Sequence, residues 1–347
     1  MPDQDRPVLV TGGAGFAGAY VVKELLDRGR QVVVYDLADF RSESLYVLGD
    51  AADRVPIERG SIDNWPRLLE VFREHRPADV VHLGAIMDTH LLDRNPLLAV
   101  DVNLKGTCNV FEAARCYPTG RIVIFSSIAV HGGVVGGTID GNQPTVMARS
   151  GPLGAYSAGK LAAEAFGYAY LQEFGLDVRI VRPSALYGFG MSWFAPNYVK
   201  QIVEPAAVGE EVRLRGGGEV PRDYANVVDL AGLVAAILGG PDDADRIFYA
   251  ATGEPLRTGG DVGRIVTELI PGAVIEIGDE WTDVDRAELA FRAPVSIDNA
   301  REQLGFEPRF ADLRAGLADY LERYRSFLEA GGEPTPRPAV SNAPGGS

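Results

Sequence analysis

Pro7-Val8-Leu9-Val10-Thr11-Gly12-Gly13-Ala14-Gly15-Phe16-Ala17-Gly18 joins a short apolar run to a glycine-rich turn, in which Gly12, Gly15 and Gly18 are spaced three residues apart. A continuous apolar run of this length is typical of a buried strand in a parallel sheet. Residues 19–28 then predict a helix, and Gly29 is placed to end it. A glycine turn between strand and helix lets the backbone approach a phosphate, to which the helix N-terminus offers free N–H groups. The sequence therefore predicts a dinucleotide-binding turn in an α/β fold with a doubly wound parallel sheet.

An acidic residue ends the second apolar run. Residues 31–35 are Gln31-Val32-Val33-Val34-Tyr35, and Asp36 follows them, 18 residues after Gly18. This is close to the spacing at which a carboxylate binds the ribose hydroxyls of a dinucleotide. A carboxylate there repels a 2′-phosphate, and no arginine stands next to it. We therefore expect NAD rather than NADP.

A tyrosine and a lysine four residues apart are the candidates for chemistry. Tyr156 opens a helix-like stretch that contains Lys160, so both side chains share one helix face. A phenol with a pKa of about 10 is a poor base at neutral pH, but a nearby ammonium and a positively charged nicotinamide favour the phenolate. Upstream, residues 121–125 predict a buried strand that ends in Ser126-Ser127, where a hydroxyl can orient a substrate alcohol. These residues predict a redox enzyme in which the tyrosine moves a proton while the dinucleotide moves a hydride.

An ordered set of short motifs gives the chain a resemblance to a known family. The motifs are Thr11 to Gly18, His82-Leu83-Gly84-Ala85, Asn103-x-x-Gly106-Thr107, Ser126-Ser127-x-x-x-x-Gly132, Tyr156-x-x-x-Lys160, Arg182-Pro183-x-x-x-Tyr187-Gly188, Arg222-Asp223-Tyr224 with Asp229, and Leu304-Gly305-Phe306-x-Pro308. From about Val8 to about Tyr324 the chain resembles the extended short-chain dehydrogenases/reductases, in the NAD-dependent epimerase/dehydratase group. The resemblance implies an NAD-binding Rossmann domain over residues 1–181. It also implies a smaller, mixed substrate lobe over residues 182–330, which can interleave with the sheet.

The resemblance assigns roles by position. Tyr156 would be the general acid/base, Lys160 would hold the nicotinamide ribose and lower the tyrosine pKa, and Ser127 would be the catalytic hydroxyl, with Ser126 as the alternative. The expected cofactor contacts are Gly12, Gly15, Phe16, Ala17, Gly18, Asp36, Ser61, Ile62, Leu83, Gly84, Ala85, Asn103, Ser126, Tyr156, Lys160 and Pro183. The expected substrate contacts are Ser127, Ala185, Asn197, Arg222 and Arg292, and the two arginines suit a diphosphate.

Four positions depart from the family pattern. His131 stands where the family usually has tyrosine, and we favour a packing role for it over one beside the nicotinamide. Ala17 replaces a larger aliphatic residue, and Ser61 occupies the place of an aspartate near the adenine. Ala185 replaces an asparagine that often contacts the substrate, which weakens the case for an ordinary sugar-nucleotide site.

The residues after Ser127 narrow the reaction. Family members that eliminate water carry an Asp-Glu pair there, and decarboxylating members place a glutamate at the second position. This chain has Ile128-Ala129, which cannot exchange protons. The leading prediction is a nucleotide-sugar 4-epimerase that oxidises and re-reduces one alcohol. The rival is an NAD-dependent dehydrogenase of a small polyol, sugar acid or hydroxy amino acid, favoured by Ala185 and by an unusual insert over residues 132–154. A non-catalytic dinucleotide sensor is disfavoured because such relatives usually lose the Tyr/Lys pair.

Composition limits the partners. The chain of 347 residues has a formal charge of −15, which disfavours nucleic acid because phosphate neutralisation needs clustered basic residues. We find no signal peptide, no apolar stretch long enough to span a bilayer and no metal-ligand spacing among the four histidines, so a cytoplasmic protein without a metal is expected. Residues 331–347 are rich in Gly and Pro and predict a disordered tail. By resemblance, helices near residues 97–114 and 156–174 would pair two copies into a homodimer.

Overall fold

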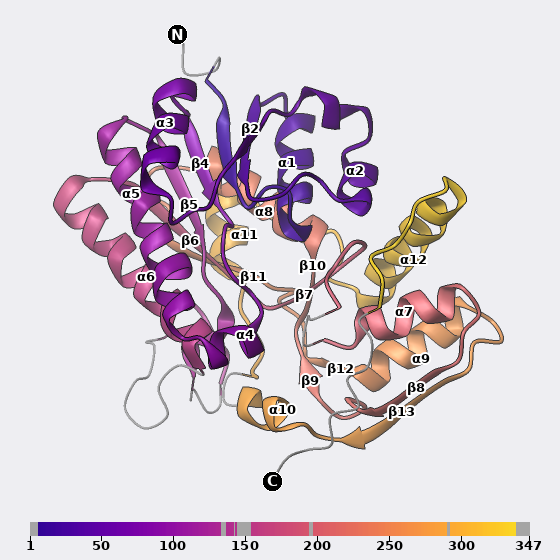
Figure 1. The fold of residues 1–347 in the computed structure, drawn as a ribbon. Helices are drawn as coiled ribbons and strands as arrows, with labels where there is room; N and C mark the ends of the chain where they lie inside the picture. Colours follow the sequence, from indigo (N-terminus) through magenta and orange to yellow (C-terminus); the bar gives the residue numbers. More distant parts are fainter. Residues whose placement is uncertain are drawn as a thin grey trace.

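The computed structural model describes residues 6–132, 137–141, 143, 154–193, 197–289 and 292–337. Within these ranges a parallel sheet of seven strands lies at the centre of the N-terminal part, in the spatial order β11-β6-β5-β4-β1-β2-β3 (Figure 1). The chain runs from β1 outward to β2 and β3, then returns to the other side of β1 as β4. Ligands of open parallel sheets bind where the strand order reverses in this way. The strands are β1 (Val8–Thr11), β2 (Val32–Asp36), β3 (Ile57–Arg59), β4 (Asp79–His82), β5 (Arg121–Phe125), β6 (Asp177–Pro183) and β11 (Ile247–Ala250).

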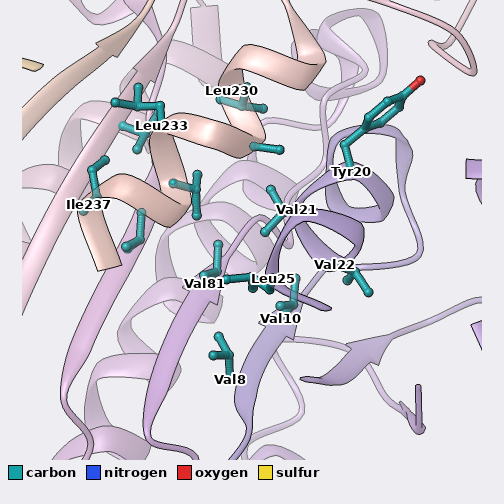
Figure 2. Close-up of a cluster of buried hydrophobic side chains, with 14 of the residues drawn as sticks. Val8, Val10, Tyr20, Val21, Val22, Leu25, Val81, Leu230, Leu233 and Ile237 are labelled. Carbon is teal, nitrogen blue, oxygen red and sulfur yellow. The ribbon is translucent and has the colours of Figure 1, made fainter. Parts of the chain in front are cut away.

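Helices cover both faces of the sheet because its strands are apolar on both sides. Val8 and Val10 of β1 pack in one cluster with α1 and α8, whereas Leu9 between them packs in another with α3 and α5. Figure 2 shows the first cluster, in which side chains from α1 and α8 gather over Val10 and Val81. The helices concerned are α1 (Phe16–Asp27), α3 (Trp65–His75), α5 (Gly106–Cys116), α6 (Gly154–Phe174) and α8 (Val227–Gly239).

A second lobe has its own core. Its buried side chains come from the segment after β7 and from α7, α9 and α12, which enclose a cluster that includes Phe189, Val203 and Tyr320. The lobe contains α7 (Val199–Ala207), α9 (Gly259–Leu269), α10 (Asp283–Glu288) and α12 (Leu313–Glu329). Its strands form short pairs: β7 (Ala185–Tyr187) with β10 (Tyr224–Asn226), β8 (Val212–Gly216) with β13 (Ile275–Glu280), and β9 (Pro221–Arg222) with β12 (Arg257–Thr258).

The two lobes interleave along the chain. After residue 182 the chain returns to the sheet twice, as α8, which packs on α1, and as β11, which pairs with β6. The helix α11 (Asp298–Leu304) then packs beside α8 and β11. The expected boundary at residues 181/182 falls inside β6, whose last two residues still pair with β11, so it does not separate two contiguous bodies.

One expectation is confirmed with a difference in detail, and one needs correction. The helix expected near residues 97–114 is present, but its first part is a π-helix, η3 (Ala99–Lys105), which continues without a break into α5. The tail expected to be disordered from Gly331 makes defined contacts as far as Arg337, because Thr335 donates hydrogen bonds to Glu43 at 2.8 and 2.6 Å. Residues 338–347 lie outside the described residues, as does most of the insert over residues 132–154.

The remaining elements connect these layers. They are α2 (Ser42–Leu48), η2 (Gly49–Arg54), α4 (Thr89–Arg94) and η4 (Ile128–His131). Across the described part of the chain, no helix is both long enough and apolar enough to cross a membrane.

Candidate active site

The glycine turn packs tightly against the end of β4. Gly12 has φ of +71°, and a Cβ on it would lie 2.7 Å from the backbone nitrogen of Gly84. A Cβ on Gly18 would lie 2.3 Å from the carbonyl oxygen of Gly12. Side chains at these positions would therefore push the turn away from the sheet edge. Gly15 is the N-cap of α1, so the first turn of this helix points its backbone N–H groups toward the same edge.

Asp36 is fixed beside this turn. The residue ends β2, and its Oδ2 accepts a hydrogen bond from the backbone N–H of Ala14 at 3.0 Å. Its Oδ1 accepts a second one from the backbone N–H of Ala38 at 3.2 Å. The carboxylate is thereby anchored at the carboxyl end of the strand next to β1, where the sequence predicted a ribose contact.

The expected adenine contacts lie past the next strand. The carbonyl of Ser61 accepts a hydrogen bond from the Tyr35 hydroxyl at 2.8 Å, and that of Ile62 accepts one from Asn109 at 3.1 Å. Ile62 packs on Gly106, where an added Cβ would come within 2.5 Å of its side chain. The pair is thus held on the same edge of the sheet as Asp36.

Asn103 holds the segment after β4 in place. Its Oδ1 accepts a hydrogen bond from the backbone N–H of Ile86 at 2.8 Å, and its Nδ2 donates one to the carbonyl of the same residue at 3.0 Å. Asn103 is buried in the π-helix η3. The expected cofactor contacts Leu83, Gly84 and Ala85 lie directly before this clamped residue, so Asn103 fixes their backbone.

The Ser127 hydroxyl lies beside the Tyr156 phenol, within reach of a hydrogen bond that lowers the pKa of the phenol. Ser127 follows β5 and caps η4, with its Oγ accepting from the backbone N–H of Ala129 at 3.1 Å. Burial raises the pKa of Tyr156 to about 12, and the hydrogen bond from Ser127 acts in the opposite direction. The structure pairs Ser127, rather than Ser126, with the tyrosine, since Ser126 Oγ is buried and has no hydrogen-bond partner among the described residues.

Lys160 lies one helical turn beyond the tyrosine. Its Nζ donates to the carbonyl of Phe125 at 2.7 Å and lies 5.8 Å from the centre of the Tyr156 ring. Burial lowers the pKa of Lys160 to about 8, while the nearby Glu164 acts to raise it. The lysine is therefore mostly protonated at pH 7 and places a positive charge beside the phenol.

The histidines of this region are structural. His131 is fully buried, and its Nε2 lies 2.7 Å from the Tyr249 hydroxyl and 3.2 Å from Nη1 of Arg182. Burial lowers its pKa to about 4, with a further lowering by Arg182. His82 lies between Thr11 Oγ1 at 2.6 Å and Thr107 Oγ1 at 2.9 Å, and burial lowers its pKa to about 3. Both rings are neutral at pH 7.

The segment around Pro183 continues the site into the second lobe. Pro183 ends β6, and the next residue, Ser184, donates its hydroxyl to the carbonyl of Asp223 at 2.7 Å. The backbone N–H of Ala185 donates to the same carbonyl at 3.0 Å. The backbone that carries Arg222 is therefore joined directly to the segment that follows the catalytic sheet.

The other expected substrate contacts already have protein partners. Asn197 is buried, donates to the carbonyl of Leu186 at 2.7 Å and accepts from the backbone N–H of Val199 at 3.2 Å. Arg222 and Arg292 do lie together, as the sequence suggested, but both form ion pairs with Glu288 of α10. Glu288 is not among the residues expected at this site from the sequence. The signal for it was an acid four residues before Arg292 in the sequence, although α10 ends at Glu288 and Arg292 lies beyond the helix.

One group of possible metal-binding atoms occurs within the described residues. Glu58, Glu74 and His75 bring one ligand atom each within 4.8 Å of one another. Glu58 already pairs with Arg67, and its other oxygen lies 2.8 Å from the His75 ring. We assign no metal to this group.

Comparison with known proteins agrees with this geometry. The family model described as the NAD dependent epimerase/dehydratase family matches residues 8–250. The chain is 29% identical to a UDP-glucose 4-epimerase of Mycolicibacterium smegmatis, over 92% of this chain and 98% of the relative. It is also 29% identical to a dTDP-glucose 4,6-dehydratase of Streptomyces niveus, over 92% of each chain.

Solved structures give the same result. A UDP-glucose 4-epimerase from Thermotoga maritima, solved with UDP-glucose, aligns with a TM-score of 0.79 and 25% identity, over 93% of this chain and 99% of the other. The Thermus thermophilus UDP-glucose 4-epimerase, solved with NAD, aligns with a TM-score of 0.73 and 27% identity, over 92% and 99%. The close-packed glycine turn and the anchored Asp36 fit NAD, which is the cofactor. The chain belongs to the NAD-dependent epimerase/dehydratase family.

Proposed function

We propose that the protein is an NAD-dependent 4-epimerase of a nucleotide-activated sugar. The observation that carries this proposal is the placement of Ser127 beside Tyr156, together with the two side chains after Ser127, which cannot exchange protons. Ile128 is buried in an apolar cluster, and Ala129 packs against that cluster. Elimination of water or loss of a carboxyl group would need an acid at this place, and none stands there. The residues present support the oxidation of one alcohol and the reversal of that step.

The chain's own groups would handle the proton. Bound NAD supplies the hydride acceptor and, in its oxidised form, a positive charge next to the phenol. Tyr156 would take the proton of the substrate hydroxyl, and Ser127, which lies beside the phenol, would orient that hydroxyl. Lys160 would favour the phenolate form of Tyr156, because its ammonium lies 5.8 Å from the centre of the ring. Return of the proton from Tyr156 would complete the second half of an epimerisation.

The second candidate is a net dehydrogenase of a small polyol, sugar acid or hydroxy amino acid. One observation favours it: the guanidinium groups expected to meet a diphosphate are engaged by carboxylates. Ala185, at the place of a substrate-binding asparagine, points the same way. A dehydrogenase and an epimerase would use Ser127, Tyr156 and Lys160 identically and differ in whether the reduced cofactor leaves.

Cofactor retention separates the two candidates. The protein is purified without added nucleotide, desalted and denatured, and the released NAD and NADH are quantified. Near one equivalent per chain supports an internally recycled cofactor and hence the epimerase. A protein that carries no nucleotide but reduces added NAD with a polyol, sugar acid or hydroxy amino acid supports the dehydrogenase instead. Interconversion of UDP-glucose and UDP-galactose is then the direct assay for the epimerase.

We also propose that the protein is a homodimer. Several large apolar side chains are exposed on the segment from Leu97 to Val100 and on α6, namely Leu97, Val100, Phe166 and Phe174. Exposed apolar side chains gathered on neighbouring helices are typical of protein interfaces. Light scattering on the purified protein measures the mass directly, and a monomeric mass would contradict this assignment.

A further inference from the structure

A single carboxylate oxygen lies between the two arginines of the second lobe. Oε2 of Glu288 accepts a hydrogen bond from Nη1 of Arg222 at 2.8 Å and pairs with Nη2 of Arg292. The side chain of Arg222 is 1% exposed and that of Glu288 is 15% exposed. The two guanidinium groups therefore share one buried anionic oxygen, an arrangement that a phosphate oxygen could also provide.

A second carboxylate completes the charge balance. Oδ1 of Asp285 accepts from Nη2 of Arg222 at 2.8 Å. Its Oδ2 accepts from the Tyr198 hydroxyl at 3.0 Å and from the Thr282 hydroxyl at 2.7 Å, and these contacts fix it at the start of α10. Two arginines thus face two carboxylates, and the group as a whole carries no net charge.

The two carboxylates are held differently. Asp285 is built into the capping box of α10 and is 3% exposed. Glu288 is at the other end of this helix, is more exposed, and contacts the arginines through one oxygen. In addition, Nε of Arg222 is buried and has no hydrogen-bond partner among the described residues. Arg222 can therefore donate one more hydrogen bond, from Nε. Of the two carboxylates, Glu288 is the one that an incoming anion can replace.

We infer that Glu288 is a specificity-determining residue that occupies the place of the substrate diphosphate between Arg222 and Arg292. The inference rests on the proposed nucleotide-sugar function. A diphosphate binds here by displacing the glutamate, so that part of its attraction to the arginines is offset by the loss of the Glu288 contacts. The internal carboxylate therefore selects against anions that cannot replace both of its contacts at once.

The place of this group in the fold connects it to the chemistry. Arg222 ends β9, and the carbonyl of the next residue, Asp223, accepts from Ser184 Oγ and from the backbone N–H of Ala185. These residues follow Pro183, at the carboxyl end of the strand beside the one that carries Ser127. An anion bound by the two arginines would therefore lie next to the segment that borders the proposed reaction centre.

The test compares three ligands on NAD-loaded protein by calorimetry: uridine, UDP and inorganic pyrophosphate. For Glu288→Gln we expect UDP and pyrophosphate to bind at least tenfold more tightly than to the unmodified protein, with no change for uridine, because the amide no longer competes as an anion. Glu288→Ala should change the affinities in the same direction. Asp283→Asn is the matched control, since it removes one negative charge from the same helix at an exposed position that does not contact either arginine.

Two of the possible binding results would overturn the inference, and a third would separate it from the proposed function. Unchanged or weaker binding of UDP and pyrophosphate to both Glu288 variants overturns the inference, because the glutamate then either does not compete or serves to hold the arginines for the ligand. An equal gain in Asp283→Asn also overturns it, since a general charge effect would then suffice. If pyrophosphate binding tightens as expected but no nucleotide sugar is bound or turned over, the exchange at Glu288 stands and the proposed substrate class fails.

Discussion

At the residue scale, Tyr156 shows two opposing effects on one phenol. Burial raises its pKa to about 12, whereas the hydrogen bond from Ser127 lowers it. Lys160 adds a positive charge 5.8 Å from the ring centre. The protein alone therefore does not make a strong base, and the charge of the oxidised cofactor is needed to favour the phenolate.

Tyr156→Phe should abolish turnover while NAD binding survives. General acid/base catalysis contributes about 10²- to 10⁴-fold, so the loss in kcat should lie in this range or beyond it. Steady-state rates and NAD titration give the two readouts. Tyr168→Phe, which removes an exposed hydroxyl from the same helix, is the control. Substantial activity in Tyr156→Phe would show that another group moves the proton.

Asp36→Ala should weaken NAD more than NADP. The carboxylate is anchored by the N–H groups of Ala14 and Ala38, and its removal takes away the ribose contact while also relieving repulsion of a 2′-phosphate. Fluorescence titration with both dinucleotides measures the ratio of the two affinities. Asp39→Ala, an exposed acid that pairs with Arg59, is the control. Equal losses for the two dinucleotides would remove this role from Asp36.

His82 should make the protein less stable in acid. Its pKa is about 3 in the folded state, below about 6.5 in the unfolded chain, so the unfolded chain takes up a proton that the folded one cannot. The stability contributed by the neutral ring is complete above pH 6.5 and is lost as the pH falls toward 3. The difference in unfolding free energy between the unmodified protein and His82→Asn should shrink by about 2 kcal/mol between pH 7.5 and pH 5. Urea unfolding at both pH values measures it, and a constant difference would contradict the assignment.

At the element scale, the π-helix η3 places Asn103 where an α-helix would not. π-helical turns often occur at functional sites, and this one brings the asparagine side chain to both backbone groups of Ile86. The irregular turn therefore fixes the loop that carries Leu83, Gly84 and Ala85. The wider packing supports it, because Gly159 of α6 lies against the backbone of η3.

Asn103→Ala should lower the free energy of unfolding by about 2 kcal/mol, because two hydrogen bonds to a partly buried backbone are lost. NAD affinity should fall with it, since the loop before Ile86 loses its anchor. Thermal melting and NAD titration give the two measurements. Asn109→Ala, which removes one side-chain hydrogen bond to the Ile62 carbonyl, should cost less stability. A larger loss in Asn109→Ala than in Asn103→Ala would contradict this ranking.

At the scale of the whole molecule, the irregular segment over residues 333–337 contacts parts of the protein that are far apart in the sequence. Ser42 donates to the carbonyl of Glu333 at 2.8 Å, and Trp193 donates to the carbonyl of Thr335 at 3.0 Å. Arg337 lies over the Trp193 ring at 5.6 Å. Residues 333–337 thus connect α2, next to the cofactor-binding sheet, with the segment after β7 in the second lobe.

Truncation after Gly332 should destabilise the protein. Oε1 of the buried Glu43 would lose both of its hydrogen bonds from Thr335, and a buried carboxylate oxygen left without a partner costs about 2 kcal/mol. For a chain of this size we expect the melting temperature to fall by about 3 °C. A truncation after Arg337 keeps these contacts and is the control. Equal melting temperatures for the two truncated proteins would show that residues 333–337 do not stabilise the fold.

The sequence by itself determined the parallel sheet, the glycine turn, Asp36 and the order of Ser127, Tyr156 and Lys160, because each depends on local patterns. Apolar runs identify buried strands, glycine permits close backbone approach, and an i, i+4 spacing sets one helix face. The parallel sheet confirms the predicted fold, and the family match confirms the predicted family and cofactor.

Only the tertiary structure decided which distant residues form hydrogen bonds and ion pairs. The clamp of Asn103 on Ile86, the tail contact at Glu43 and the pairing of Glu288 with Arg222 join residues that no local pattern connects. Asp285 and Arg222, for example, are 63 residues apart in the chain and 2.8 Å apart in space. Electrostatic and hydrogen-bond partners depend on distances in the folded chain, and these follow from the packing of the two lobes rather than from spacing along the sequence.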